Sequence, residues 1–382
     1  MKNPKYVTQL TQITQLSEEQ KVRLNIVSER FAFRSNEYYQ ELIDWDDPMD
    51  PIRRVVIPIE DELEQWGELD VSDEGLYTKV RGLEHKYKET ALLLVNNVCG
   101  GYCRFCFRKR LFMDDNDEAV NDITEGLNYI REHEEITNVL LTGGDPLVMS
   151  TNKLENIIKG IREIDHVKII RIGTKMPAFS PARILNDPSL LEMIQRYTTN
   201  TKKIYIMLHF NHSRELVDAS IEGINRLQKA GAITVNQTPL IRGINDDPIV
   251  LSKLFDQMSF IGVPSYYVFQ CRPTLGNKSY SVPLEEAYEI FLGSLTRGSG
   301  LAKRARFVMS HATGKIEVVG MTGEYIFFRY HQSADPENSS LFMFFKRNPN
   351  AHWFDDYEET RRLNGKAKDL IVAESSCDSC AF

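Results

Sequence analysis

Residues 98–112 read VCGGYCRFCFRKRLF and place Cys99, Cys103 and Cys106 in a C-x3-C-x2-C arrangement. They follow the strongly apolar run 91–95 (ALLLV), which has the composition of a buried parallel strand. A compact cysteine loop at the end of a strand is a geometry typical of metal sites. Three thiolates can hold three irons of a [4Fe–4S] cluster and leave the fourth iron free to bind a small molecule.

The residues around the cysteines suit such a cluster. Tyr102 and Phe105 would shield it from water, and four basic residues would offset its negative charge: Arg104, Arg108, Lys109 and Arg110. Two plainer interpretations stay open, a zinc site, which usually takes a fourth Cys or His nearby, and three ordinary buried thiols. The spacing at a strand end is far more specific than a lone C-x2-C, so it favours the cluster.

The composition indicates a large soluble enzyme. The chain has 382 residues, 42% of them hydrophobic, so it can bury a sizeable core. A formal net charge of −8 argues against nucleic-acid binding, which needs a clustered basic face. No stretch approaches the ~20 apolar residues that span a bilayer, and the polar N-terminus is unlike a signal peptide. With six cysteines, three of them in the loop, we expect a reducing cytoplasm and no disulfide framework.

From residue 89 onward, strand-like and helix-like runs alternate at the spacing of βα units. The expected strands are 90–97, 138–142, 168–174, 204–210, 233–241 and 265–271. The expected helices are 118–132, 151–164, 189–197, 214–230, 248–260 and 284–295. Six strands make an incomplete barrel, so the sequence predicts an α/β fold with a partial (β/α)6 barrel. Helices between parallel strands bring the C-terminal strand ends to one face, where sites of such folds are assembled.

The barrel divides the chain into three expected parts. Residues 1–88 read as an N-terminal helical arm, packed on the barrel or on a second subunit. Ser17 and Gln20 have the pattern of a capping box at the start of a helix in this arm. Residues 89–297 form the barrel, and residues 298–382 read as a β-rich cap over its open mouth.

The end of the chain carries a second cysteine pair, Cys377 and Cys380. These two thiols could share a zinc ion with another subunit, but they supply only half of a zinc site. A flexible tail is the plainer interpretation.

The cysteine motif, with an aromatic residue before its last cysteine, resembles that of the radical S-adenosylmethionine (radical SAM) enzymes. Flanking motifs narrow the resemblance to the lysine 2,3-aminomutase family and cover most of the chain. They are Gly82-Leu-Glu-His85-Lys-Tyr87, Arg108-Lys-Arg110, Thr142-Gly-Gly-Asp145-Pro-Leu147, Arg171-Ile-Gly173, His209-Phe-Asn-His212, Asn236-Gln237, Arg242-Gly243 and Tyr266-Tyr-Val-Phe-Gln270-Cys271. The resemblance implies an isomerase in which the cluster cleaves S-adenosylmethionine (SAM) to a 5′-deoxyadenosyl radical.

Five residues at strand ends are candidates for binding SAM. Gly143 and Gly144 would leave main chain open to the amino and carboxylate groups of the methionyl part. Asp145 would accept from the ammonium or cap the next helix, and a plain turn is the alternative for all three. His209 and Gln237 are carried over from the family as residues near SAM. His212 stays unassigned.

The resemblance implies a second cofactor, pyridoxal 5′-phosphate (PLP), bound covalently to a lysine beyond the barrel strands. The matching stretch is Ala312-Thr-Gly314-Lys315, between two apolar runs. Lys315 in an internal cavity would be desolvated enough to act as a nucleophilic amine. The alternative is an ordinary lysine of a hairpin turn.

The substrate pocket departs from the lysine enzymes. Those enzymes place an aspartate after the Tyr-x-x-x-Gln-Cys strand and another before the lysine loop, whereas this chain has Arg272 and Ser310-His311 there. An arginine favours a carboxylate or phosphate through its two-pronged donor geometry. Arg108 and Arg272 are therefore the candidate substrate-binding residues, and free lysine is not the expected substrate.

Three functions remain open. The first is a 2,3-aminomutase acting on an amino acid with an acidic, neutral or unusual side chain. The second is a PLP-independent radical SAM enzyme of the same fold, and the third is a non-catalytic iron–sulfur or zinc protein. The expected partners are a small amino-acid substrate, an electron donor such as flavodoxin or ferredoxin, and other copies of the chain in a homo-oligomer.

Overall fold

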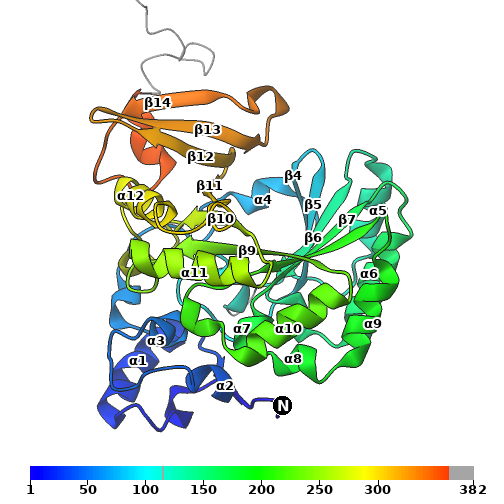
Figure 1. The fold of residues 1–382 in the computed structure, drawn as a ribbon, viewed down its shortest axis with the longest axis horizontal. Coiled ribbons are helices and arrows are strands. Elements are labelled where there is room, and N and C mark those ends of the chain that lie inside the picture. The colour runs from blue at the N-terminus through cyan, green and yellow to red at the C-terminus, as the bar shows by residue number, and fades with distance from the viewer. Residues whose placement is uncertain (114–115, 361–382) are drawn as a thin grey trace, which may run out of the picture.

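The structure, a computed structural model, describes residues 1–113 and 116–360. One sheet of twelve strands runs through it in the order β14-β13-β12-β11-β10-β9-β8-β7-β6-β5-β4-β3 (Figure 1). Its strands are β3 (Thr78–Val80), β4 (Leu83–Tyr87), β5 (Thr90–Asn96), β6 (Asn138–Gly143), β7 (Ile169–Thr174), β8 (Lys203–Leu208), β9 (Ile233–Leu240), β10 (Ser265–Gln270), β11 (Arg306–His311), β12 (Gly314–Met321), β13 (Tyr325–Ser333) and β14 (Phe342–Lys346). A separate two-stranded sheet pairs β1 (Tyr6–Val7) with β2 (Ser35–Asn36).

The six predicted parallel strands are confirmed as β5 to β10, each within two residues of its expected bounds. A seventh parallel strand follows, because β11 pairs with β10 in the register Tyr267↔Arg306 and Val268↔Phe307. The sequence grouped this strand with the cap. β12, β13 and β14 then pair antiparallel, each with the strand before it. The cap strands therefore belong to the same continuous sheet as the barrel strands.

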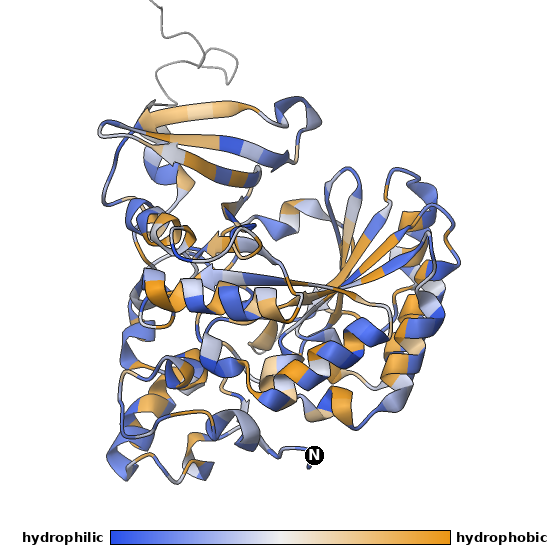
Figure 2. Ribbon diagram, in the orientation of Figure 1, coloured by the Kyte–Doolittle hydropathy of each residue, from blue (hydrophilic) through white to orange (hydrophobic). Residues whose placement is uncertain are grey.

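Helices follow the strands as expected. They are α1 (Glu18–Arg30), α2 (Glu37–Gln40), α3 (Pro51–Val56), α4 (Glu74–Tyr77), α5 (Thr124–Glu132), α6 (Thr151–Arg162), α7 (Met176–Phe179), α8 (Ala182–Leu185), α9 (Pro188–Tyr197), α10 (Asp218–Lys229), α11 (Pro248–Phe260) and α12 (Leu284–Leu295). Figure 2 shows hydrophobic residues along the central strands and a mixed pattern on the surrounding helices. The largest buried cluster lies between these layers and includes Val139, Ile170, Ile206 and Ile224.

Two helices begin later than the sequence predicts. We expected a helix from Glu118, but α5 begins at Thr124 because Val120 N donates to Leu94 O at 3.0 Å and Glu118 accepts from Arg110. The helix expected from Arg214 is split into a short 3-10 turn and α10, which begins at Asp218. In that turn the carboxylate of Glu215 accepts from Asn211 N at 2.6 Å, which ties it to the preceding loop.

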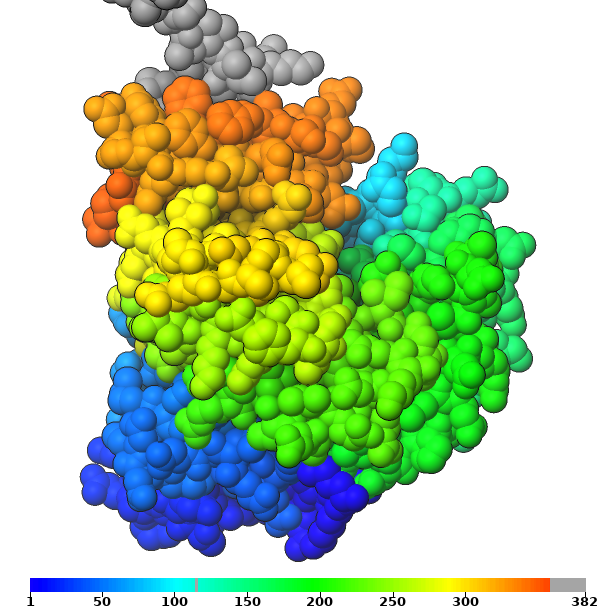
Figure 3. Space-filling view, in the orientation of Figure 1, coloured from blue at the N-terminus to red at the C-terminus, as the bar shows by residue number. Residues whose placement is uncertain are grey.

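The N-terminal arm packs on the barrel (Figures 1 and 3). The predicted capping box is present, since Ser17 Oγ accepts from Gln20 N at 3.2 Å and Gln20 Oε1 from Ser17 N at 2.9 Å. The arm shares a buried cluster with barrel loops, in which Ile52 and Val55 pack with Phe105 and Phe179. Cys377 and Cys380 lie outside the described residues.

The cap and the arm meet across a seam beside the barrel. Three successive carbonyl oxygens there each accept a hydrogen bond from a side chain of residues 72–86. Ser72 Oγ donates to Ser310 O at 3.0 Å, Lys86 Nζ to His311 O, and Tyr77 Oη to Ala312 O at 2.7 Å. The cap and the arm are therefore joined here by hydrogen bonds from side chains to main-chain carbonyl oxygens, and not by strand pairing. Among the described helices, none has the length and apolar character needed to cross a membrane.

Candidate active site

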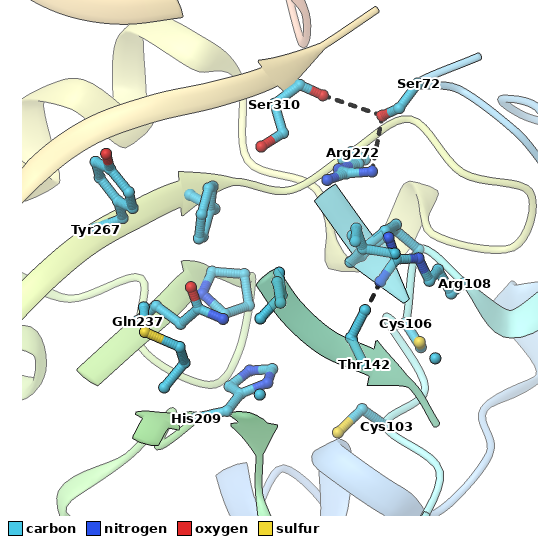
Figure 4. A pocket seen from close by; sticks show the side chains of 18 of the residues that line it. Ser72, Cys103, Cys106, Arg108, Thr142, His209, Gln237, Tyr267, Arg272 and Ser310 are labelled. Carbon is cyan, nitrogen blue, oxygen red and sulfur yellow. Dashed lines mark hydrogen bonds between the residues drawn. The ribbon is translucent and has the colours of Figure 1, made fainter. Parts of the chain in front are cut away.

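A cavity of about 350 Å³ opens at the C-terminal ends of the parallel strands and extends under the cap. All eleven residues proposed for the site line it: Cys99, Cys103, Cys106, Arg108, Gly143, Gly144, Asp145, His209, Gln237, Arg272 and Lys315. In Figure 4, Cys103 and His209 lie toward one end, and Arg272 lies with Ser72 and Ser310 toward the other. His212 does not line the cavity; its side chain accepts from Arg214 N.

The cysteine loop is held by the N-terminal arm. Arg34 Nε donates to Cys99 O at 2.8 Å, and Asn36 Nδ2 to Gly100 O at 3.0 Å. A Cβ on Gly100 would lie 2.6 Å from Met176 Sδ and 3.1 Å from Phe179 Cβ, so a side chain there would have to displace Met176. These contacts fix the loop main chain before any metal is bound, which is what a preorganised cluster site requires.

Burial raises the pKa of all three thiols, that of Cys103 to about 12. Thiolates at these positions therefore need a positive partner, and a metal cluster supplies one. In the described part of the chain no three His, Cys, Asp or Glu side chains are arranged around a single ion. In a [4Fe–4S] cluster each thiolate binds a different iron, so Cys99, Cys103 and Cys106 would fit as its three donors without converging on a single ion.

The Gly-Gly pair holds two strand ends together. A Cβ on Gly143, whose φ is +114°, would lie 2.3 Å from Asn96 O, and one on Gly144 would lie 2.4 Å from Val98 O. The amide of Gly144 already donates to Asn96 O at 2.5 Å, so it is not the open donor that the sequence suggested. A side chain at position 144 would displace Val98, which precedes the first cysteine.

Asp145 caps the short 3-10 helix that follows β6 and binds it to the end of β7. Its Oδ1 accepts from Leu147 N at 2.9 Å, and its Oδ2 accepts from Thr174 Oγ1 at 2.9 Å and Lys175 N at 2.7 Å. Burial raises the pKa of this carboxyl to about 6. Of the two roles considered for Asp145, the helix cap is the one the hydrogen bonds support, because both oxygens are used within the chain.

His209 presents an unsatisfied nitrogen beside a fixed cation. Its Nε2 is buried and has no hydrogen-bond partner among the described residues. Burial, with a smaller effect of Lys175, holds the pKa of His209 well below its ordinary value, so the imidazole is neutral. Lys175 Nζ donates to Glu215 Oε1 at 2.6 Å and Asn211 Oδ1 at 2.8 Å. A neutral imidazole with a free nitrogen suits a polar, uncharged ligand group such as a nucleoside.

Two acids in the cavity wall were missed from the sequence. Glu74 and Glu84 both line the cavity and are 7% exposed each. Glu74 pairs with Arg108 at 2.8 Å and Arg110 at 2.6 Å. Glu84 Oε1 has no hydrogen-bond partner among the described residues, and burial, with the charge of Glu74, raises its pKa to about 7. Glu84 lies two residues before Lys86, another residue that lines the cavity, and this strand periodicity was the available signal.

Lys315, the second residue of strand β12, lines the cavity. Its Nζ lies 4.4 Å from the ring centroid of Tyr267, and it has no acidic partner within 4 Å among the described residues. Burial, then the positive charges of Arg171, Arg272 and Lys86, lower the pKa of Lys315 to about 7. Arg171 also lines the cavity, and its buried Nε has no partner in the described chain. This end of the cavity therefore combines a reactive amine with unbalanced positive charge.

Comparison with known proteins gives the class first. The model of the radical SAM superfamily matches residues 93–253. A putative L-lysine 2,3-aminomutase of Aquifex aeolicus is 59% identical, covering 94% of this chain and 96% of that protein. The L-lysine 2,3-aminomutase of Clostridium subterminale is 36% identical, covering 74% and 67%. The glutamate 2,3-aminomutase of Clostridioides difficile is 35% identical, covering 77% and 69%.

The chain is thus a radical SAM protein, a class that carries a [4Fe–4S] cluster and uses SAM. Within that class it belongs to the L-lysine 2,3-aminomutase family. The resemblance drawn from the sequence motifs is confirmed.

Proposed function

We propose that this protein is a 2,3-aminomutase that binds PLP at Lys315 and moves an amino group on an amino acid other than free lysine. The observation that carries the proposal is that the three cysteines and Lys315 line the same cavity. Lys315 has no acidic partner within 4 Å among the described residues, and its pKa is lowered to about 7. A sensor protein would need only the cysteines. A PLP-independent enzyme would not need a half-buried amine in the same cavity as Arg171, whose Nε has no hydrogen-bond partner among the described residues.

Each end of the cavity has a proposed task. Cys99, Cys103 and Cys106 hold the cluster, and His209 and Gln237 contact the nucleoside part of SAM. Arg171 and Lys86 are the proposed partners of the PLP phosphate, since they are half-buried cations in the cavity wall, and cations without an acidic partner favour a doubly charged anion. PLP, when bound, supplies a conjugated ring that stabilises an unpaired electron during the migration. The chain itself positions these groups and excludes water.

Arg272 is the proposed recognition residue for the substrate side chain. Its guanidinium stacks on Phe107, with Cζ 3.6 Å from the ring centroid, and donates to Ser72 Oγ at 2.7 Å. Burial lowers its pKa to about 10, so it stays charged at neutral pH. A carboxylate is its natural ligand. The relative named for glutamate is consistent with an acidic substrate in this family.

The first test is covalent attachment of PLP. Borohydride reduction of the anaerobically reconstituted protein with PLP, followed by peptide mapping, should find the adduct on Lys315. Lys86 is the matched control, because it is a second lysine in the same cavity. An adduct on Lys86 alone, or none at all, would leave the PLP-independent enzyme as the better interpretation.

The same reaction should depend on pH. Because the pKa of Lys315 is lowered to about 7, its reactive neutral amine is half populated there and dominant above it. An ordinary lysine, with a pKa of about 10.4, is almost fully protonated at pH 7. The initial rate of adduct formation should rise through pH 7 and reach a plateau by about pH 8.5. A rate still rising steeply at pH 10 would contradict a desolvated Lys315.

The second test concerns Arg272. Arg272→Asp should lower kcat/KM for glutamate by more than about a hundredfold, since removing one partner of a buried charge pair costs about 3–5 kcal/mol. The new carboxylate would also face Glu74, which now lies 3.9 Å from Arg272. Arg272→Lys, which keeps the charge, is the control and should lose less. Faster wild-type turnover of lysine than of glutamate would refute the assignment.

A further inference from the structure

Of the four basic residues expected to offset the negative charge of a cluster, three are paired with acids of the chain itself. Arg104 Nη2 lies 2.7 Å from Glu62 Oε2. Arg108 and Arg110 both pair with Glu74, at 2.8 Å and 2.6 Å. A cation whose charge is already matched by a carboxylate adds little net field at a neighbouring site.

Lys109 is the exception among the four. Its side chain is buried, with 6% of the residue exposed, and its Nζ makes no hydrogen bond among the described residues. It also forms no ion pair with a described acid, unlike the three arginines. Its contact with the N-terminal arm is aromatic, because Nζ lies 4.4 Å from the ring centroid of Phe31. A cation–π contact of this kind stabilises an ammonium group without neutralising its charge.

An unpaired ammonium group in a protein interior is costly, because burial removes its hydration and no described neighbour replaces it. Burial lowers the pKa of Lys109 to about 8, although the charge of Glu62 acts in the opposite direction. The group therefore stays mainly charged at neutral pH. A methionine could pack on Phe31 without this cost, so packing alone does not account for a lysine at this position.

The position of Lys109 couples its charge to the cysteine loop. It begins the 3-10 helix Lys109–Phe112, three residues after Cys106. Burial raises the pKa of the Cys106 thiol, opposed first by a backbone hydrogen bond from Arg108 and then by the charge of Lys109. The ammonium is therefore close enough to favour a thiolate at Cys106. Lys109 does not line the cavity, so it lies outside the space proposed for SAM and substrate.

We infer that Lys109 supplies the unmatched positive charge of the cluster site and thereby makes the cluster easier to reduce. A cluster held by three thiolates is anionic, and it gains a further negative charge when a low-potential one-electron donor reduces it. A neighbouring cation stabilises the reduced form more than the oxidised form and so raises the reduction potential. The electron enters the cluster, and no bond of the protein forms or breaks. The inference rests on the proposed cluster ligands and is independent of PLP and of the substrate.

The test is a reductive titration of the reconstituted protein without SAM, in which electron paramagnetic resonance follows the reduced cluster. Lys109→Met removes the charge and keeps the side-chain length. At a fixed potential, the ratio of reduced to oxidised cluster should therefore fall at least about tenfold, which is a fall of about 59 mV in midpoint potential for a one-electron couple. Lys109→Arg keeps the charge and should stay within about twofold of wild type. Lys278→Met is the matched control, since Lys278 is half exposed and paired with Glu64, and it should also stay within about twofold.

A second measurement separates this role from a purely structural one. The melting temperature of the cluster-free protein should be unchanged or higher in Lys109→Met, because methionine fills the same buried position without an unpaired charge. A structural lysine would give the opposite pattern, a lower melting temperature with an unchanged midpoint potential. That pattern would overturn the inference, and so would an equal fall of the potential in Lys109→Arg.

Iron per chain is measured before each titration and distinguishes the remaining outcomes. If Lys109→Met fails to fold or binds no iron, Lys109→Gln removes the same charge and is titrated instead. Iron in Lys109→Arg but in neither neutral variant would show that the cluster needs this charge in order to be held, which supports the inference. Loss of iron in all three variants would overturn it. A wild-type protein that binds no iron would instead contradict the cluster ligands themselves.

Discussion

Replacing Cys99, Cys103 or Cys106 with alanine should each abolish the cluster and the SAM cleavage that depends on it. Each variant removes one of three iron ligands, and the remaining two thiols have pKa values raised by burial. A thiol that stays protonated is a poor iron ligand. We expect iron per chain to fall close to background, and 5′-deoxyadenosine formation to fall by more than a thousandfold.

Cys271 provides a matched control within the same cavity. Its thiol is also buried, lines the cavity and has a pKa raised by burial to about 12, but it follows β10 and lies outside the motif. Cys271→Ala should therefore keep wild-type iron content after anaerobic reconstitution. Full SAM cleavage in any of the three motif variants, or complete loss of iron in Cys271→Ala, would refute the ligand assignment.

The barrel was predictable because its signals are local. A buried parallel strand such as β6 reads as an apolar run, and the residues that follow it lie at the C-terminal strand face by topology alone. For that reason the positions of His209 and Gln237 in one cavity followed from sequence order, although they belong to different strands. Strand order did not reveal what each side chain bonds to.

The Gly-Gly-Asp motif shows this difference. The motif lines the cavity as expected, and Asp145 takes one of the two roles considered for it, the helix cap, whereas the amide of Gly144 is not an open donor. Gly144 is small because Val98 passes within 2.4 Å of its Cβ position, and Asp145 binds Thr174 and Lys175. The sequence shows that a small or acidic residue stands at a position. It does not show which distant neighbour requires that residue.

Glu74 was missed for the same reason. It lies in the largely polar stretch 67–75, which has the composition of a solvated loop. Its partners, Arg108 and Arg110, come from the cysteine loop and become neighbours only because residues 67–74 cross the loop after β10. Charges paired over such separations carry no periodic signal.

We expect the second large mutational effect at the contact between the N-terminal arm and the cysteine loop. Glu62 of the arm and Arg104 of the loop form a buried ion pair at 2.7 Å, with side chains 0% and 2% exposed. Arg104 also donates to Ala32 O at 3.0 Å, and Glu62 Oε1 accepts from Tyr280 Oη at 3.2 Å. The pair therefore joins the arm, the cluster loop and the loop after β10 at one point.

Glu62→Gln should destabilise the protein by about 3–5 kcal/mol, because it leaves the Arg104 guanidinium buried without a counter-charge. The loss should reach the cluster as well, since Arg104 N donates to Val55 O at 2.8 Å in the same contact between arm and loop. Urea unfolding measures the first effect, and iron per chain after reconstitution measures the second. Glu64→Gln is the control: its partner is Lys278, both side chains are about half exposed, and such pairs contribute less than about 1 kcal/mol. Equal unfolding midpoints for the two variants would show that the arm does not depend on the buried pair. Normal iron content in a destabilised Glu62→Gln would show that the loop holds the cluster without the arm.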